Sequence, residues 1–104
     1  MRILFDEQDV MDSVHVFIAA KANRGFVEGS EPQHVRDVEV IFNSGFSARG
    51  SLHGSNYYLS QQDLIDAVAT YMSSYYSFAA DRLSIDLSWD EETREFSAEI
   101  IVRR

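Results

Sequence analysis

The sequence lacks cysteine, and this absence excludes several kinds of chemistry. A disulfide framework, a thiol nucleophile and a cysteine-ligated metal site all require residues that the chain does not have. The sequence also lacks any run of about eighteen apolar residues, so we expect no membrane-spanning helix. Asp6 and Glu7 come before the apolar stretch of a signal peptide could form, which favours a cytoplasmic protein.

Positive charge is also scarce. The chain has 9 Lys and Arg residues against 17 Asp and Glu residues, and its net charge is −8. A nucleic-acid-binding protein usually shows a basic surface, because neutralising phosphates supplies much of its affinity. We therefore expect no nucleic-acid partner and no membrane association. The acidic balance favours solubility and basic or cationic partners.

The 104 residues are enough for about one domain, and the chain repeats itself. "LFDEQDVMDSV" at 4–14 matches "YLSQQDLIDAV" at 58–68, with 54 residues between equivalent positions. Further on, "VEVIFN" at 38–43 matches "IDLSWD" at 85–90, and Phe46-Ser47-Ala48 matches Phe96-Ser97-Ala98. The shared order predicts a single domain of two pseudo-repeats, at about residues 2–53 and 54–104. Chance similarity between two helix starts is the alternative.

Each half of the chain shows helical spacing followed by two alternating segments. Apolar residues recur at helical intervals over 7–23 and 61–77. Apolar and polar residues alternate, as in half-buried strands, over 38–42, 46–52, 83–89 and 96–102. Segments 2–5 and 56–59 lead into the helices in extended form. These patterns predict an α+β fold, a two-layer sandwich with duplicated (α-β-β)x2 order. We expect an antiparallel sheet with two helices on one face, and the strand order stays open.

The repeated acidic stretch is best explained as a helix start used twice. Asp6 and Ser60 stand where an N-cap side chain accepts a backbone N–H, and Asp9 and Asp63 follow three residues later. This is the spacing of a capping box, with Asp in place of the usual Glu or Gln. Apolar residues flank both starts as hydrophobic staples, pairing Phe5 with Val10 and Leu59 with Leu64.

Two pairs of helix residues, one of aspartates and one of tyrosines, each allow two interpretations. Asp12 and Asp66 lie opposite the apolar stripe, where a solvated face competes with a carboxylate pair that binds a cation or moves protons. Tyr71 and Tyr75 fall on the stripe, as members of the core or of an aromatic binding surface.

The sequence shows no catalytic motif, so we name no catalytic residue and expect a non-enzyme. It lacks the G-x-S-x-G elbow, the phosphate loop and G-x-G-x-x-G. No pair among His15, His34 and His53 has metal-ligand spacing, so we predict no metal site and no cofactor. A metal site would have to be assembled from distant parts of the chain.

The segment 24–37 is the one region that breaks the internal symmetry, and unpaired insertions often carry function. It is either a tolerated surface insertion or a flap that covers a groove or docks a partner. The candidate ligand-binding residues are His34 and His53, with Phe26 and the acids of the loop.

The solvent face of the predicted strands is polar except at two isoleucines. Ile41 and Ile101 interrupt this polar face. We expect Arg49 and Arg103 to pair with acidic residues across an interface. We therefore predict that these four residues form a contact surface for a homodimer or another protein partner.

The second half of the sequence resembles an uncharacterised family of small Bacillus-type proteins of unknown function. The resemblance rests on "LSQQDLIDAV" followed by "LSIDLSWDEETREFSAEI". Members share a Ser-Glu-Gln-Asp-like helix start and a Phe-Ser-Ala-like strand, and the resemblance covers most of residues 58–100 and, more loosely, 4–14. Gln61 and Asp6 depart from that start. The resemblance implies no activity.

Taken together, these features favour a small non-enzymatic binding or interaction module. The alternative is a small ligand- or metal-binding protein or enzyme, with a pocket between the sheet and the 24–37 loop.

Overall fold

The structure is a computed structural model, and it describes residues 1–103. Its elements confirm the α+β class and follow the predicted order within a few residues. The helices are α1 (Glu7–Ala22) and α2 (Gln61–Tyr75), and the short 3-10 turns are η1 (Pro32–His34) and η2 (Ala80–Arg82). The strands are β1 (Arg2–Phe5), β2 (Arg36–Phe42), β3 (Phe46–Leu52), β4 (Ser55–Leu59), β5 (Leu83–Asp90) and β6 (Glu95–Val102). Within the described residues, neither helix has the length and apolar character needed to cross a membrane.

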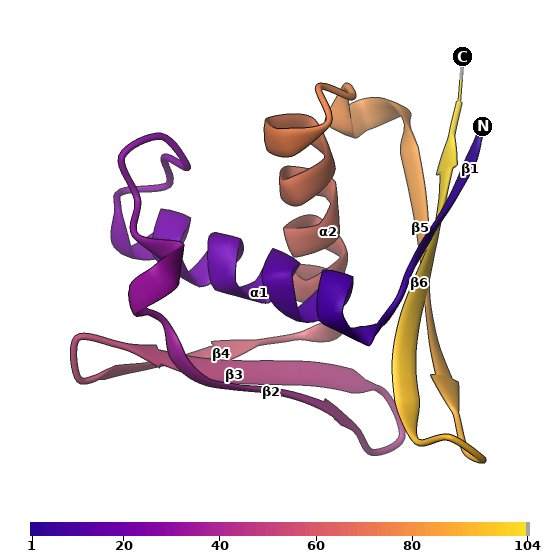
Figure 1. Cartoon of the computed structure of the whole chain (residues 1–104), viewed down its shortest axis with the longest axis horizontal. Helices are drawn as coiled ribbons and strands as arrows, with labels where there is room; N and C mark the ends of the chain where they lie inside the picture. The colour runs from indigo at the N-terminus through magenta and orange to yellow at the C-terminus, as the bar shows by residue number, and fades with distance from the viewer. Residues whose placement is uncertain (104) are drawn as a thin grey trace.

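The strands form two antiparallel sheets, each of three strands, where the sequence suggested one sheet of four. The β2–β3 and β5–β6 hairpins do not pair with each other, and each instead gains one lead-in segment as an edge strand. β1 pairs with β6, placing Arg2 opposite Ile101, and β4 pairs with β3. Each sheet therefore joins the hairpin of one half to the first strand of the other half. The two sheets meet at an angle, and both helices lie on its inner side (Figure 1).

Both helices begin as the sequence predicted. The Asp9 N–H donates to Asp6 Oδ1 at 2.9 Å, and the Asp6 N–H donates back to Asp9 Oδ2 at 3.1 Å. Ser60 and Asp63 exchange the equivalent bonds at 3.1 and 3.0 Å. These reciprocal bonds satisfy backbone donors that a helix start otherwise leaves free. The staple residues are buried as pairs, Phe5 with Val10 in one core cluster and Leu59 with Leu64 in the other.

The core consists of two clusters, one for each sheet. The first contains Ile18 and fills the space between the helices and β2-β3-β4. The second contains Met72 and Ile100 and covers β1-β6-β5. Val40 of β2 and Leu87 of β5 pack against both clusters. The clusters are therefore joined at the centre of the molecule, and each helix is held by both.

Aromatic rings close the corner where the sheets meet. The ring of Phe42 on β2 stacks on that of Trp89 on β5, with centroids 5.9 Å apart. Phe46 and Phe96 meet edge to face at 6.1 Å beside this pair. Such contacts contribute on the order of 1 kcal/mol each beyond the area they bury. The four rings therefore join the β2–β3 hairpin to the β5–β6 hairpin at this corner.

Candidate functional site

The insertion between α1 and β2 is tied to the body of the protein at both ends. It spans residues 23–35, because Arg36 and Asp37 of the predicted loop belong to β2. At its start, the Gly25 N–H donates to the Ala20 carbonyl oxygen of α1 at 2.7 Å. Within the insertion, Asn23 Nδ2 donates to the carbonyl oxygens of Phe26 and Glu28 at 3.0 and 3.1 Å. At its end, Val35 is buried in the core cluster of β2-β3-β4. The turn η1 near its end is thus held in a fixed place.

The turn η1 brings two side chains of the insertion together. In a 3-10 helix, residues three apart lie on the same side. Pro32 fixes the first backbone angle of the turn, and the His34 N–H donates to the Glu31 carbonyl at 3.0 Å. The same turn places His34 Nδ1 at 3.0 Å from Glu31 Oε2. Local geometry alone therefore pairs one imidazole with one carboxylate.

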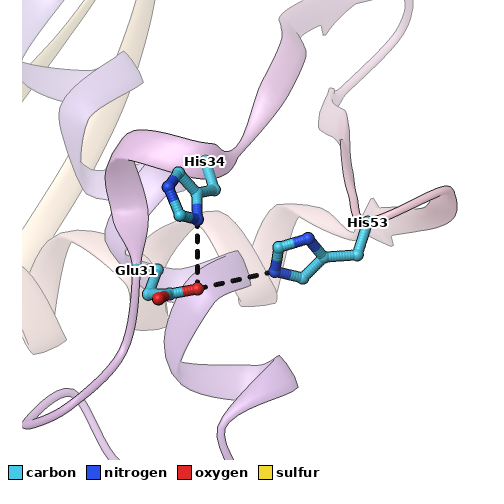
Figure 2. Close-up of side chains that lie close together, drawn as sticks. All are labelled: Glu31, His34 and His53. Carbon is cyan, nitrogen blue, oxygen red and sulfur yellow. Dashed lines mark hydrogen bonds and ion pairs between the residues drawn. The ribbon is translucent and has the colours of Figure 1, made fainter.

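A second imidazole comes from the tight turn between β3 and β4. His53 and Gly54 both have left-handed backbone angles, with φ of 51° and 84°, as a two-residue hairpin requires. The left-handed conformation costs a residue with a Cβ about 1 kcal/mol, and Asn or Gly is the usual choice there. His53 Nε2 lies 3.5 Å from the same Oε2 atom of Glu31, on which both histidines converge (Figure 2).

The three donor atoms have the geometry of an incomplete metal site. His34, His53 and Glu31 each offer one ligand atom, an imidazole nitrogen or a carboxylate oxygen, and these three atoms all lie within 4.8 Å of one another. Bonds of about 2.0–2.2 Å to a tetrahedral zinc ion place neighbouring ligand atoms about 3.4 Å apart. The two distances to Glu31, 3.0 and 3.5 Å, bracket that value.

The cluster lies at the surface. The exposed fractions of the Glu31, His34 and His53 side chains are 51, 46 and 65%. Exposed ion pairs contribute between zero and about 1 kcal/mol to folding, because water screens them. The cluster therefore contributes little to the stability of the fold, and its residues can be changed without unfolding the protein.

The structure places the other sequence-predicted residues apart from this cluster. Phe26 is exposed elsewhere in the insertion. Ile41 lies on β2 and Ile101 on β6, so the two isoleucines belong to different sheets. Arg49 is paired with Glu39 on its own sheet at 2.7 Å, and Arg103 donates to the Asp81 carbonyl oxygen at 3.1 Å. A contact role for these residues stays a prediction.

Sequence reasoning missed a hollow between the helices and η1. It has a volume of about 430 Å³ and is lined by residues that include Asp12, His15, Tyr71 and Tyr75. The available signal was the spacing of four residues between Gln8 and Asp12 and between the two tyrosines, which places each pair on one helix face. That spacing does not predict that residues of the insertion form one side of the hollow.

Comparison with known proteins identifies the family. The model described as "Protein of unknown function (DUF2653)" matches residues 1–92 and, in a second match, residues 55–104. The chain belongs to this family. A relative, "Uncharacterized protein YxcD" of Bacillus subtilis (strain 168), is 25% identical over 104 residues, covering 98% of this chain and 95% of that protein. No solved structure matches.

Membership of the DUF2653 family confirms the resemblance seen in the sequence. Its two overlapping matches are consistent with a duplicated architecture. Neither the description of the family nor the name of this relative states an activity. The function must therefore be argued from the site.

Proposed function

We propose that this protein is a small non-enzymatic binding module that holds a divalent transition-metal cation between Glu31, His34 and His53. One observation carries the proposal: two separate segments bring two imidazole nitrogens and a carboxylate oxygen within 4.8 Å of one another. This is the assembly from distant parts that the histidine spacing did not predict. It gives the metal-binding alternative a specific site.

The donor set selects the kind of ion. Imidazole suits zinc, copper, nickel and iron, whereas magnesium and calcium prefer sites made of oxygen. Three protein ligands leave a fourth position of a tetrahedral ion open to water or to a group from a partner. The net charge of −8 also favours cations near the surface.

The exposure of the cluster favours binding over catalysis. Metal-assisted reactions depend on a shaped cavity that excludes water around the ion. Each of the three side chains is about half exposed or more. A bound ion would face open solvent, which suits metal storage, sensing or metal-dependent contact with another molecule.

Zinc titration by calorimetry tests this proposal on the full chain. We expect one zinc ion per chain, with affinity lowered at least about tenfold by His53→Asn and by Glu31→Gln. His53→Asn suits the test because Asn favours the left-handed turn, so the melting temperature should hold or rise. His15→Asn is the matched control, because His15 lies outside the cluster and should leave zinc affinity unchanged.

Two results would overturn the metal site. The first is no measurable zinc binding by the folded wild-type protein. The second is the same affinity in His53→Asn as in wild type, which would place the ion elsewhere.

A homodimer or protein-partner contact is a second candidate role, with the cytoplasm as its predicted location. Leu4 and Tyr58 support it, because they occupy equivalent edge-strand positions on the two sheets and are 65 and 71% exposed. Native mass spectrometry with and without chelator measures metal content and assembly together. A dimer that Leu4→Ser and Tyr58→Ser convert to monomer would support this role, and a wild-type monomer would argue against self-association.

A further inference from the structure

The hollow beside η1 is large enough for a small ligand. Its volume of about 430 Å³ falls in the range of small-molecule sites, although the hollow is shallow and largely open to solvent. The helices α1 and α2 supply most of its walls, and Pro32 and Gln33 of the insertion supply the rest. It shares η1 with the metal cluster but uses none of the proposed metal ligands, so the two sites can be tested separately.

One wall of the hollow is aromatic. The rings of Tyr71 and Tyr75 stack with centroids 4.9 Å apart and planes 30° apart. Phe5 supports Tyr71 from the side, edge to face at 5.9 Å. Aromatic faces carry partial negative charge, so a ring face that is not covered by the stack attracts cations.

The hollow is also lined by a carboxylate, that of Asp12. Gln8 Nε2 donates to Asp12 Oδ1 at 2.9 Å, which holds the side chain of Asp12 in place. Burial first, and the Asp12 carboxylate second, raise the pKa of Tyr71, so its hydroxyl stays protonated and neutral. Among the described lining residues there is no Lys or Arg, and His15 is the one side chain able to become positive. The hollow thus combines negative charge with aromatic surface.

In the first half of the molecule, an ammonium group lies near an aromatic ring of α1. Fifty-four residues before Tyr71 and Tyr75 stand Phe17 and Lys21. There the Lys21 ammonium lies 5.7 Å from the centroid of the Phe17 ring. At the equivalent place in the second half, Tyr75 replaces the lysine, and the aromatic ring is retained without the cation.

We propose that the hollow binds an organic ammonium group, with Tyr71 and Tyr75 facing the cation and Asp12 pairing with its charge. The ligand class is an alkylammonium, either a free amine or the side chain of a lysine residue. Its hydrocarbon part would lie against the apolar surface of Val16 and Pro32.

The test is a titration of isotope-labelled protein with n-butylammonium, observed through the backbone amide NMR signals. We expect saturable shifts around the hollow and none with 1-butanol, which has a similar shape but no charge. Tyr75→Lys should abolish binding, because it recreates the Lys21 arrangement and fills the site from within. Asp12→Asn should weaken binding by about fivefold or more.

Asp66→Asn is the matched control. Gln62 donates to Asp66 Oδ1 at 3.0 Å, which repeats the Gln8–Asp12 bond on a helix face outside the hollow. We expect wild-type affinity in this variant. Equal weakening by Asp66→Asn and Asp12→Asn would mean binding by general surface charge and would overturn the proposal. Equal binding of butanol, or unchanged binding by Tyr75→Lys, would also overturn it.

A parallel titration with N-acetyl-lysine methylamide distinguishes the source of the ammonium. Binding at least as tight as that of n-butylammonium supports recognition of a lysine side chain in a peptide. Weaker binding supports recognition of a free amine.

Discussion

The two halves of the molecule share their helix starts and differ in the connection between helix and hairpin. Both run in the order strand, helix, strand, strand, and both helices open with a capping box. In the first half, residues 23–35 separate helix from hairpin, and they carry Glu31 and His34. In the second half, residues 76–82 make the same connection. The shared features build the fold, and the unshared insertion contributes to both candidate sites.

The halves also differ in how a helix meets its sheet. At Gly50, an added Cβ would lie 2.7 Å from Ile18 Cδ1, so the missing side chain lets α1 approach β3 closely. The equivalent position on β6, fifty residues later, holds the fully buried Ile100. In the first half, the side chain of Ile18 from the helix occupies the space beside Gly50. In the second half, the strand residue Ile100 supplies the buried side chain itself.

The largest expected loss of stability comes from removing the buried side chain of Ile100 on β6. Ile100→Ala should lower the free energy of unfolding by about 3–4 kcal/mol, through lost burial and the cavity left behind. Urea denaturation measures the loss. Ile101→Ala, one residue along the same strand and only half-buried, is the control and should cost about 1 kcal/mol. Equal losses would contradict the assigned core face of β6.

The next largest loss of stability comes from adding a side chain at Gly50 on β3. Gly50→Ala should cost about 1–3 kcal/mol, because its Cβ overlaps the buried end of Ile18. Adding Ile18→Val removes the overlapping atom, so the double variant should be more stable than Gly50→Ala alone. Denaturation of all three variants gives the coupling between the two residues. Purely additive losses would show that the close approach is not the reason for glycine at this position.

The capping boxes predict a smaller difference. Asp63→Ala should cost about 1 kcal/mol at neutral pH, and Asp9→Ala should cost less. The Ser60 N–H, which donates to Asp63, lowers the pKa of that carboxyl. Burial first, with the like charge of Asp6 as a further cause, raises the pKa of Asp9 despite the bond from the Asp6 N–H. The second box therefore gains more from an ionised acid than the first.

The signs of these shifts predict opposite pH dependence. The contribution of Asp63 is complete above the ordinary carboxyl pKa and is lost as the pH falls through its lowered value. Asp9 favours its protonated form in the fold, so its contribution is present at low pH and lost as the pH rises through its raised value. Chemical denaturation of the two alanine variants across acid pH measures both trends. Parallel trends would contradict the opposite signs of the two shifts.

The smallest predicted effect is electrostatic. Asp6→Ser gives the first capping box the residue found in the second, which removes a like charge beside Asp9. The pKa of Asp9 should fall, as carbon-detected NMR titration of its carboxyl would show. Ser60→Asp is the reciprocal change and should raise the pKa of Asp63. No movement in either variant would contradict the Asp6 charge as a cause of the difference.

The local features of this fold were readable in the sequence. Asp6, Ser60 and the acids three residues later mark the helix starts through contacts that span a single turn. Alternation of apolar and polar residues identified the four main strands for the same reason. The division into two sheets was not readable, because β1 and β6 lie at opposite ends of the chain.

The candidate metal site could also be predicted only in its local parts. The histidines His34 and His53 were named from the sequence, but their meeting was not predicted. Their rings lie with centroids 5.7 Å apart because η1 and the β3–β4 turn meet in space, which no local spacing encodes. The choice of Glu31 among the loop acids needed the 3-10 turn, since that turn aligns it with His34.

The most direct test of the proposed metal site is the histidine imidazole ¹H–¹⁵N spectrum, recorded as zinc is added to the wild-type protein. We predict that the signals of His34 Nδ1 and His53 Nε2 move together until one ion per chain is bound, while those of His15 stay in place. Unmoved signals from His34 and His53, or equal changes in all three histidines, would contradict the site.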